Sequence, residues 1–346
     1  MKALVLENYM QLKYKDVPDP VIGDDEVLIE VKAAGICGSD VHGMDGSTGR
    51  RIPPVIMGHE ASGVIVEIGK NVNGWSSGNR VTFDSTIYPL DDWFTRKGLY
   101  NLSDGRMVLG VSAQEFRRDG AYAEFVAVPQ HILYKIPESV SFTRAAMVEP
   151  AAVALHAVNL ASVSVNDSAV VVGSGMIGLF IVQMLKLSGC TRIIAVDISD
   201  DKLQLAKDLG ATHLINSSTS NNGLTEITDI TGGRGADISF EVVGISDTVN
   251  FAADSLRKGG TLTLVGNLSS EINMPLQKVV TRQLRLQGSC AINGEYQAVL
   301  DLMDRGLVNT GIILSAEAPL SEGAQWFKRL YEKEKGLNKV VLLPGT

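Results

Sequence analysis

Short hydrophobic runs in the first 150 residues predict a β-rich domain. The runs are rich in β-branched and aromatic residues and are bounded by Gly, Pro, Asn and Asp, which is typical of strands separated by turns. The strands expected in this part of the chain are 27–32, 63–68, 80–83 and 122–128.

From about residue 168 the pattern changes to continuous apolar runs that alternate with helical segments. Such runs predict strands buried on both faces, so their alternation with helices predicts a doubly wound parallel sheet. The expected elements are strands at 169–172, 192–196, 236–243 and 261–265, and helices at 177–188, 200–209 and 247–257. Ser199 is expected to cap the second of these helices and Gly210 to end it.

After about residue 284 the alternation is less regular. Helices are expected at 293–305 and 321–333, followed by a last strand at 339–343. An edge strand is expected near 285–290. Together these patterns indicate the α/β class, with a β-rich part before the parallel sheet.

Length, charge and cysteine usage narrow the function. A chain of 346 residues is too long for one ordinary core, which favours two domains. Its net charge of −8 argues against nucleic acid or an anionic membrane as a partner, because both need a basic face. The longest apolar stretch, 169–187, is interrupted by polar residues and is interpreted as a strand and a helix, not a membrane span.

Only three cysteines occur, which is not a disulfide framework, so a reducing, cytoplasmic location is expected. Cys190 and Cys290 are expected to be buried structural residues, whereas Cys37 lies in a motif considered below.

A G-x-G-x-x-G turn predicts a dinucleotide site, because it follows an apolar strand and opens a helix. Its glycines permit a tight turn and a close approach of backbone to pyrophosphate, and the helix N-terminus offers N–H donors. The candidate cofactor-binding residues of the turn are Gly173, Gly175, Met176, Ile177 and Gly178.

Asp197 ends the next expected strand, where a carboxylate can hydrogen-bond the adenosine ribose. It would repel a ribose phosphate, and Ile198 offers no arginine to receive one, so NAD is favoured over NADP; Lys202 leaves NADP open as an alternative. Val243 and Val265, which end two later strands, are further candidate cofactor-binding residues.

Three residues in separate segments are candidate metal ligands: Cys37, His59 and Glu149. A thiolate, an imidazole and a carboxylate suit zinc, and three protein ligands leave a position open for water or substrate. Taken singly, each has an ordinary structural interpretation, and spacing alone does not decide between the two.

The motifs around these residues decide in favour of a metal. Over essentially its full length the chain resembles the medium-chain zinc-dependent dehydrogenases, which include alcohol, sorbitol and threonine dehydrogenases. The shared motifs, in the family's order, are Gly-Ile-Cys-Gly-Ser-Asp-x-His at 35–42, Gly-His-Glu-x-x-Gly at 58–63, Gly-Asn-Arg-Val at 78–81, Arg-Asp-Gly-Ala-Tyr-Ala-Glu-Phe at 118–125, Glu-Pro at 149–150 and the nucleotide motif. The Glu-Pro form resembles the polyol, or sorbitol-type, branch, whereas the arginine pairs at 50–51 and 117–118 could receive a sugar phosphate as in galactitol-1-phosphate dehydrogenases.

The resemblance implies a GroES-like catalytic domain, residues 1–152 and 290–346, into which a Rossmann NAD-binding domain, residues 153–289, is inserted. It assigns one catalytic zinc to Cys37 and His59 with an acid, either Glu60 or Glu149. It also implies a homodimer or homotetramer, for which the edge strand near 285–290 is a candidate interface.

The resemblance also implies a mechanism. Zinc lowers the pKa of the substrate hydroxyl, Ser39 and His42 relay its proton, and a hydride passes to the nicotinamide. Asp40 would orient a ligand histidine.

One departure from the family concerns its structural zinc. Where many relatives have four cysteines, this chain has Pro89, Asp92, Thr95 and Ser103, so no structural zinc is expected. The lobe is expected to be held by an apolar plug of Tyr88, Trp93, Phe94 and Leu99, with weak ion pairs of Asp91 or Asp92 to Arg96 or Lys97, or else to be mobile.

The predicted function is an oxidoreductase that transfers a hydride between NAD and a secondary hydroxyl of a polyol, sugar alcohol or cyclitol. One alternative is a sugar-alcohol phosphate as substrate, received by Arg50-Arg51 or Arg117-Arg118. An alternative of another class is a catalytically silent dinucleotide-binding protein, which retention of the motifs argues against.

Overall fold

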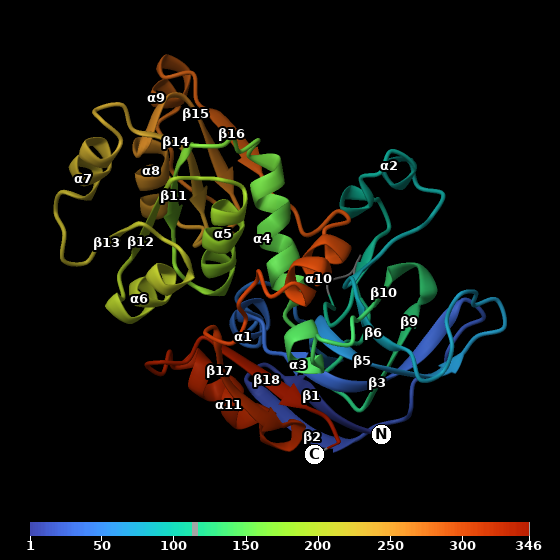
Figure 1. The fold of residues 1–346 in the computed structure, drawn as a ribbon. Helices are drawn as coiled ribbons and strands as arrows, with labels where there is room; N and C mark the ends of the chain where they lie inside the picture. The colour runs from blue at the N-terminus through green and yellow to red at the C-terminus, as the bar shows by residue number, and fades with distance from the viewer. Residues whose placement is uncertain (113–116, 346) are drawn as a thin grey trace. The chain divides into compact units, whose positions relative to one another are not determined.

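The chain folds into two units in the computed structural model, which describes residues 1–112 and 117–345 (Figure 1). Unit 1 is formed by Met1–Glu149 together with Ile292–Thr346, and unit 2 by Pro150–Ala291. The expected boundaries, after residues 152 and 289, lie within three residues of these divisions.

A sheet of seven strands forms the centre of unit 1, in the order β10-β6-β5-β3-β18-β17, with β9 also paired to β3. The strands are β3 (Glu26–Gly35), β5 (Glu60–Ile68), β6 (Arg80–Phe83), β9 (Phe125–Pro129), β10 (Leu133–Lys135), β17 (Leu314–Pro319) and β18 (Lys339–Leu343). The expected strands 27–32, 63–68, 80–83 and 339–343 are confirmed, whereas the strand expected at 122–128 begins only at Phe125. Because β18 pairs with β3, the end of the chain completes the sheet that its beginning starts.

Smaller elements make up much of the rest of unit 1. They are the strands β1 (Lys2–Asn8), β2 (Gln11–Asp16), β4 (Val55–Ile56), β7 (Thr86–Ile87) and β8 (Met107–Val108), and the helices α1 (Gly38–Gly43), α2 (Trp93–Arg96), α3 (Phe142–Ala145), α10 (Tyr296–Asp304) and α11 (Gly323–Tyr331). Alternate residues of β3 are buried, which places Val27, Ile29 and Val31 in the core. Tyr122 is fully buried there and packs edge-on against Phe327 of α11.

Unit 2 is a six-stranded parallel sheet in the order β13-β12-β11-β14-β15-β16. Its strands are β11 (Ser168–Val172), β12 (Arg192–Asp197), β13 (His213–Asn216), β14 (Ala236–Glu241), β15 (Leu256–Leu264) and β16 (Arg285–Gly288). Its helices are α4 (Val148–Leu160, which begins in unit 1), α5 (Met176–Leu187), α6 (Asp200–Leu209), α7 (Gly223–Ile230), α8 (Ser246–Asp254) and α9 (Leu276–Thr281). The strand order reverses between β11 and β14, and open parallel sheets bind ligands at the carboxyl ends of the strands at such a point.

Three local expectations for unit 2 are wrong. The helix expected at 247–257 ends at Asp254, because Leu256 pairs with Ala236 at the start of β15. Ser199 occupies the cap position of α6, but its side chain makes no capping hydrogen bond. Cys290 is only partly buried, although Cys190 is buried as expected.

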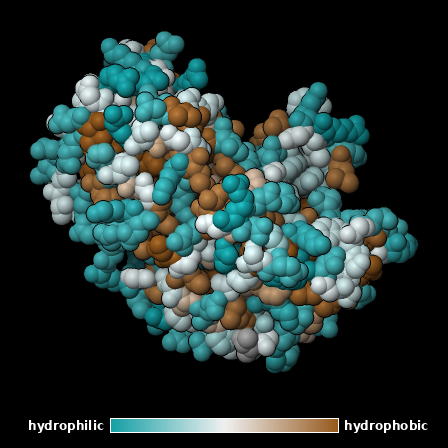
Figure 2. Space-filling view, in the orientation of Figure 1, coloured by the Kyte–Doolittle hydropathy of each residue, from teal (hydrophilic) through white to brown (hydrophobic). Residues whose placement is uncertain are grey.

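Within the described residues, no helix is both long enough and apolar enough to cross a bilayer. The face of the molecule drawn in Figure 2 is mostly hydrophilic, with apolar patches scattered between polar side chains.

The segment 88–104, called the lobe, is anchored by Tyr100 rather than by cysteines. The Tyr100 hydroxyl donates to Asp84 Oδ2 at 2.7 Å and accepts from the backbone N–H of Gly294 at 2.7 Å. The Tyr100 ring stacks on Tyr88 with 4.4 Å between centroids. Asn293 also donates to the Gly98 carbonyl at 2.8 Å. The lobe is therefore tied to the segment where the chain returns to unit 1.

The apolar plug expected for the lobe is wrong in part, since Trp93 is 63% exposed and Leu99 39% exposed. Asp92 caps α2 by accepting from the N–H groups of Phe94 and Thr95. The anchoring acid, Asp84, is buried, and burial raises its pKa to about 6 despite hydrogen bonds from Thr86 and Tyr100.

Replacing Tyr100 by Phe should loosen the lobe, because it keeps the ring but leaves Asp84 and the Gly294 N–H without the hydroxyl. The expected cost is about 1–3 kcal/mol, typical of leaving a buried polar group unpaired. Thermal unfolding and amide hydrogen exchange of residues 88–104 would measure it. Trp93→Ala, at an exposed position, is the control and should change stability by less than about 0.5 kcal/mol. A larger effect for Trp93→Ala than for Tyr100→Phe would contradict the anchor.

Candidate functional site

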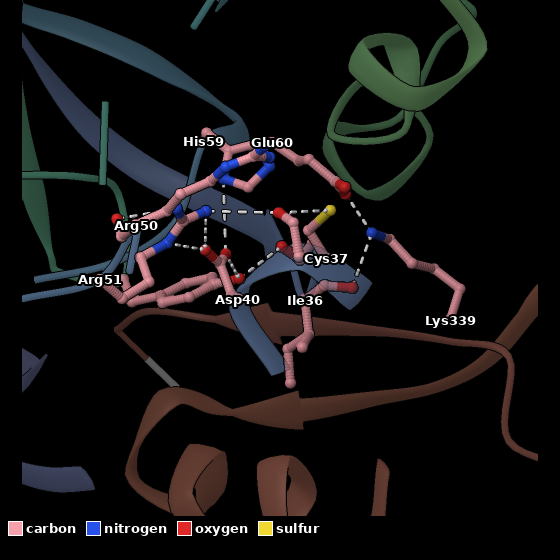
Figure 3. A network of polar contacts seen from close by, with 11 residues as sticks. Ile36, Cys37, Asp40, Arg50, Arg51, His59, Glu60 and Lys339 are labelled. Atoms are coloured by element: carbon pink, nitrogen blue, oxygen red, sulfur yellow. Dashed lines mark hydrogen bonds and ion pairs between the residues drawn. The ribbon is translucent and has the colours of Figure 1, made fainter. Parts of the chain in front are cut away.

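Cys37, His59 and Glu60 converge at one end of the large sheet in unit 1 (Figure 3). Gly35, the last residue of β3, is paired with Glu60, the first residue of β5. The antiparallel pairing therefore brings the residues just after β3 next to those that begin β5. One ligand atom from each of the three side chains lies within 4.8 Å of the others.

The donor set fits a divalent metal such as zinc. The site offers a thiol, an imidazole and a carboxyl group, and Glu60 Oε1 is buried without a hydrogen-bond partner. Loss of water around the Cys37 sulfur, followed by the charges of Glu60 and Asp40, raises its pKa to about 12. A cation bound there would compensate the buried negative charge of a Cys37 thiolate.

Asp40 lies behind His59 and is completely buried. Its Oδ2 is 3.4 Å from His59 Nδ1 and accepts a hydrogen bond of 2.8 Å from the Tyr122 hydroxyl. Its Oδ1 accepts from Arg51 Nε at 2.8 Å. Burial alone would raise the pKa of Asp40, but Arg51 and His59 hold that pKa below its usual value. A carboxylate placed in this way favours a proton on Nδ1 and leaves the other ring nitrogen of His59 free for a metal.

Lys339 is a fully buried cation beside the candidate metal site. Its Nζ forms an ion pair with Glu60 Oε2 and donates to the Ile36 carbonyl at 2.9 Å. One oxygen of Glu60 is thus occupied by Lys339, and Oε1 remains for a metal. Lys339 was not expected here from the sequence; the available signal was a charged residue at the start of an otherwise apolar terminal strand.

Glu149 lies in the first turn of α4 and is not one of the three clustered residues. Its pKa is raised well above the usual value, chiefly because the protein excludes water from the carboxyl group. The charges of Glu60 and Cys37 raise that pKa further, whereas His59 lowers it. Glu149 therefore interacts with the site electrostatically, and Glu60 is the acid that the structure places among the candidate ligands.

Ser39 and His42 both belong to α1, directly after Cys37. The Ser39 hydroxyl donates to Cys37 Sγ at 3.2 Å and accepts from Arg51 Nη2 at 3.3 Å. His42 is exposed in the last turn of α1. This arrangement offers a hydroxyl beside the metal site and an imidazole in contact with solvent.

The arginines considered for phosphate binding are partly occupied. Arg51 is buried and paired with Asp40, and Arg118 pairs with Glu26. Arg50 and Arg117 are exposed.

In unit 2 the three glycines of the 173–178 turn differ in what surrounds their Cα atoms. Gly173 has a φ of +102°, and a Cβ there would lie 2.8 Å from a Val243 methyl group. Gly178 packs so closely that its Cβ would lie 1.9 Å from the Gly173 carbonyl oxygen. A Cβ on Gly175 would meet nothing within 4 Å, so the backbone before α5 is open to a ligand. These are the features that a pyrophosphate cradle needs.

Asp197, at the end of β12, lies beside this turn. Its Oδ2 accepts from the Ser174 N–H at 2.7 Å, and its Oδ1 accepts from the Ser199 N–H at 3.0 Å. Ile198 is 72% exposed and Lys202 is partly exposed. The carboxylate is thus held at the end of β12 beside the glycine-rich turn, with no arginine next to it in sequence.

Glu241 is a second residue that the sequence analysis missed. It ends β14, is fully buried, and its Oε1 accepts from the N–H groups of Val243 and Gly244 and from the Thr248 hydroxyl. The turn carrying Val243, whose methyl group lies against Gly173, is therefore fixed by a buried carboxylate. Val265 follows β15 at the same edge, and its N–H donates to the Glu241 carbonyl.

Two family models match the chain, and both of its units have counterparts. The model of the alcohol dehydrogenase GroES-like domain matches residues 23–138, and that of zinc-binding dehydrogenases matches residues 177–305. The D-xylulose reductase of Morganella morganii is 32% identical over 96% of this chain and 98% of its own length. The sorbitol dehydrogenase of Bacillus subtilis is 31% identical over 100% of this chain and 98% of its own length.

Solved structures are similar over nearly the whole chain. Galactitol-1-phosphate dehydrogenase from Escherichia coli has a TM-score of 0.91 at 26% identity, covering 99% of this chain and 100% of its own. A zinc-binding dehydrogenase from Sinorhizobium meliloti, solved with NADP, has a TM-score of 0.90 at 28% identity and covers 99% of each chain.

Cobalt binding should report on Cys37 directly, because a Co²⁺–thiolate bond gives a strong charge-transfer absorption that oxygen and nitrogen ligands do not give. The raised pKa means that the thiol is neutral near pH 7, so binding should also release its proton. Titrating apoprotein with Co²⁺ should develop the thiolate band, and Cys37→Ser should abolish it. Cys190→Ser, which changes a cysteine buried in unit 2, is the control and should keep the band. A band that survives in Cys37→Ser would contradict the site.

Proposed function

We propose a specific reaction for this chain, which belongs to the medium-chain zinc-dependent dehydrogenase family and is an oxidoreductase. The reaction is oxidation of a secondary hydroxyl on a polyol, sugar alcohol or cyclitol, with a hydride passing to NAD. The observation that carries the proposal is the convergence of Cys37, His59 and Glu60 in a chain that also has the dinucleotide cradle. The names of the relatives, a D-xylulose reductase and a sorbitol dehydrogenase, favour the polyol class.

Cys37 and His59 are the proposed protein ligands of one catalytic zinc, with an acid as the third. Glu60 is favoured because its Oε1 is buried without a partner close to both. Glu149 is the alternative acid, since it interacts electrostatically with the same residues. A bound zinc supplies a Lewis acid that lowers the pKa of the substrate hydroxyl.

Ser39 is the proposed acceptor of the substrate proton, because its hydroxyl lies next to Cys37 and is exposed. His42, on the solvent side of α1, is suited to pass that proton to water because its imidazole can both accept and donate a proton. Asp40 holds His59 from behind and is buried away from the reacting groups.

NAD is the proposed cofactor, rather than NADP. Asp197 is fixed by two backbone N–H groups beside the glycine-rich turn, where its charge would repel a ribose phosphate. Gly173, Gly175, Met176, Ile177 and Gly178 are the proposed pyrophosphate-binding residues. The remaining proposed contacts of NAD are Ile198, Lys202, Val243 and Val265.

A phosphorylated polyol is the second candidate substrate, favoured by the similarity to galactitol-1-phosphate dehydrogenase. The ion pairs of Arg51 and Arg118 weigh against it, because those two guanidinium groups already have carboxylate partners. A single zinc per chain is proposed because the lobe has another anchor in Tyr100 and has no cysteines.

A homodimer or homotetramer in the cytoplasm is proposed. Strand β16 is at the edge of the unit 2 sheet, and Leu286 on it is 43% exposed, which favours pairing with a second copy. A reducing compartment is favoured because all three cysteines are free and the site needs Cys37 as a thiol.

A substrate panel tests the proposed reaction. Zinc-loaded protein with NAD and polyols, sugar alcohols, cyclitols and their phosphates should form NADH, followed by its absorbance, fastest with an unphosphorylated secondary alcohol. Elemental analysis of the same sample should find one zinc per chain. Turnover with no member of the panel would overturn the proposed function, and two tightly bound zinc ions would overturn the single site.

Asp197→Asn tests the choice of cofactor, since it removes the charge but keeps the shape of the side chain. The efficiency with NAD should fall about tenfold or more, because a hydrogen bond to a charged group contributes about 1.5–3 kcal/mol. The ratio of the efficiency with NAD to the efficiency with NADP should fall as well. Asp208→Asn, an exposed change further along α6, is the control. Steady-state kinetics with both cofactors give the answer, and a wild type that prefers NADP would contradict the proposal.

A further inference from the structure

Arg51 is a buried arginine that connects two parts of the candidate site. Only 2% of the residue is exposed, and its Nη2 lies 2.6 Å from Asp40 Oδ1 and 3.3 Å from Ser39 Oγ. Gly43 of α1 makes room for it, since a Cβ there would lie 2.5 Å from Arg51 Cγ. Figure 3 shows the Arg51 side chain reaching Asp40.

The contact between Arg51 and Ser39 can run in one direction only, because a guanidinium group carries hydrogen-bond donors and no acceptor. The Ser39 oxygen must accept from Arg51, so one of its two lone pairs is occupied. The Ser39 oxygen keeps its second lone pair and its hydroxyl proton. In this structure the hydroxyl donates to Cys37 Sγ, with 3.2 Å between oxygen and sulfur. Ser39 is exposed, and without Arg51 its hydroxyl would keep only the weak hydrogen bond to Cys37 Sγ to orient it.

We propose that Arg51 is a positioning residue for Ser39 in the oxidation proposed above, on which this inference rests. By occupying one lone pair, it leaves the Ser39 oxygen a single place at which to receive the substrate proton. As that proton arrives, the proton that Ser39 already holds leaves toward solvent, so the serine is unchanged. The hydride and its electron pair go to NAD, and Arg51 keeps its proton throughout.

A purely structural role for Arg51 is the competing explanation, because Arg51 also pairs with Asp40 behind His59. If Arg51 acted only through Asp40, its replacement would weaken zinc binding whether or not Ser39 is present. If it acts through Ser39, its effect on turnover should require the Ser39 hydroxyl. A double-mutant cycle separates the two routes.

The experiment uses zinc-loaded full-length protein and the polyol that the wild type oxidises best. Arg51→Lys is the main variant, because it keeps a buried cation for Asp40 while a single ammonium group is poorly shaped to bridge Asp40 and Ser39. It is compared with Ser39→Ala, with the double variant and with Arg96→Lys, an exposed control on α2. The measurements are kcat, KM, zinc content and the kinetic isotope effect with deuterated alcohol.

Arg51→Lys should keep its zinc and lower kcat about tenfold or more, since misplaced proton-transfer groups cost rates of this order. In the Ser39→Ala background the same change should alter kcat by less than about twofold. Arg96→Lys should leave kcat within about twofold of the wild type.

Two results would overturn the inference in an active enzyme: an unchanged kcat in Arg51→Lys, or an equal loss of kcat with and without Ser39. Loss of zinc in parallel with kcat would assign Arg51 to the Asp40 route and also overturn it. A wild type that oxidises no alcohol would instead remove the proposed function, and this inference with it.

Discussion

The antiparallel pairing of β3 with β5 is the constraint on which the candidate metal site depends. It sets Gly35 opposite Glu60, and a Cβ at position 35 would lie 2.5 Å from Glu60 Oε2, so a larger residue there would displace the Glu60 carboxyl group. Strand β18 pairs with the other side of β3 and brings Lys339 to the same place from 279 residues away. A shift of either register by one residue would turn these side chains to the opposite face of the sheet.

The buried charges around this pairing are arranged as acid–base pairs. Arg51 pairs with Asp40, and Lys339 with Glu60, all within the protein interior. Burying such pairs costs desolvation energy that their attraction often only balances, so stability alone does not explain them. Their effect is geometric: each cation holds its acid in one orientation, which fixes His59 from behind and leaves Glu60 Oε1 free. The site is thus prepared for a cation before one binds.

Much of unit 2 could be predicted from the sequence because its signals are local. Apolar runs predicted the parallel strands. The candidate pyrophosphate cradle is made of backbone, so three glycines and Asp197 were sufficient to predict where it lies. Unit 1 was harder, since its site joins side chains from distant segments. Cys37 and His59 lie in recognisable motifs, but Arg51 was considered only as part of a possible phosphate-binding pair, and Lys339 begins a strand with no motif. The prediction of a helix at 247–257 was wrong at its end, because the strand pairing of Leu256 outweighed the local helical periodicity.

The lobe shows why the loss of four cysteines need not disturb catalysis. Its anchor, Tyr100, bonds to Asp84 and to Gly294, 194 residues away, and neither partner is signalled by a motif in the sequence. The metal site has a separate supporting acid, Asp40, and shares neither of these hydrogen bonds. The lobe anchor and the candidate metal site are thus held by separate hydrogen bonds, although the charge of Asp84 also helps to raise the pKa of Glu149.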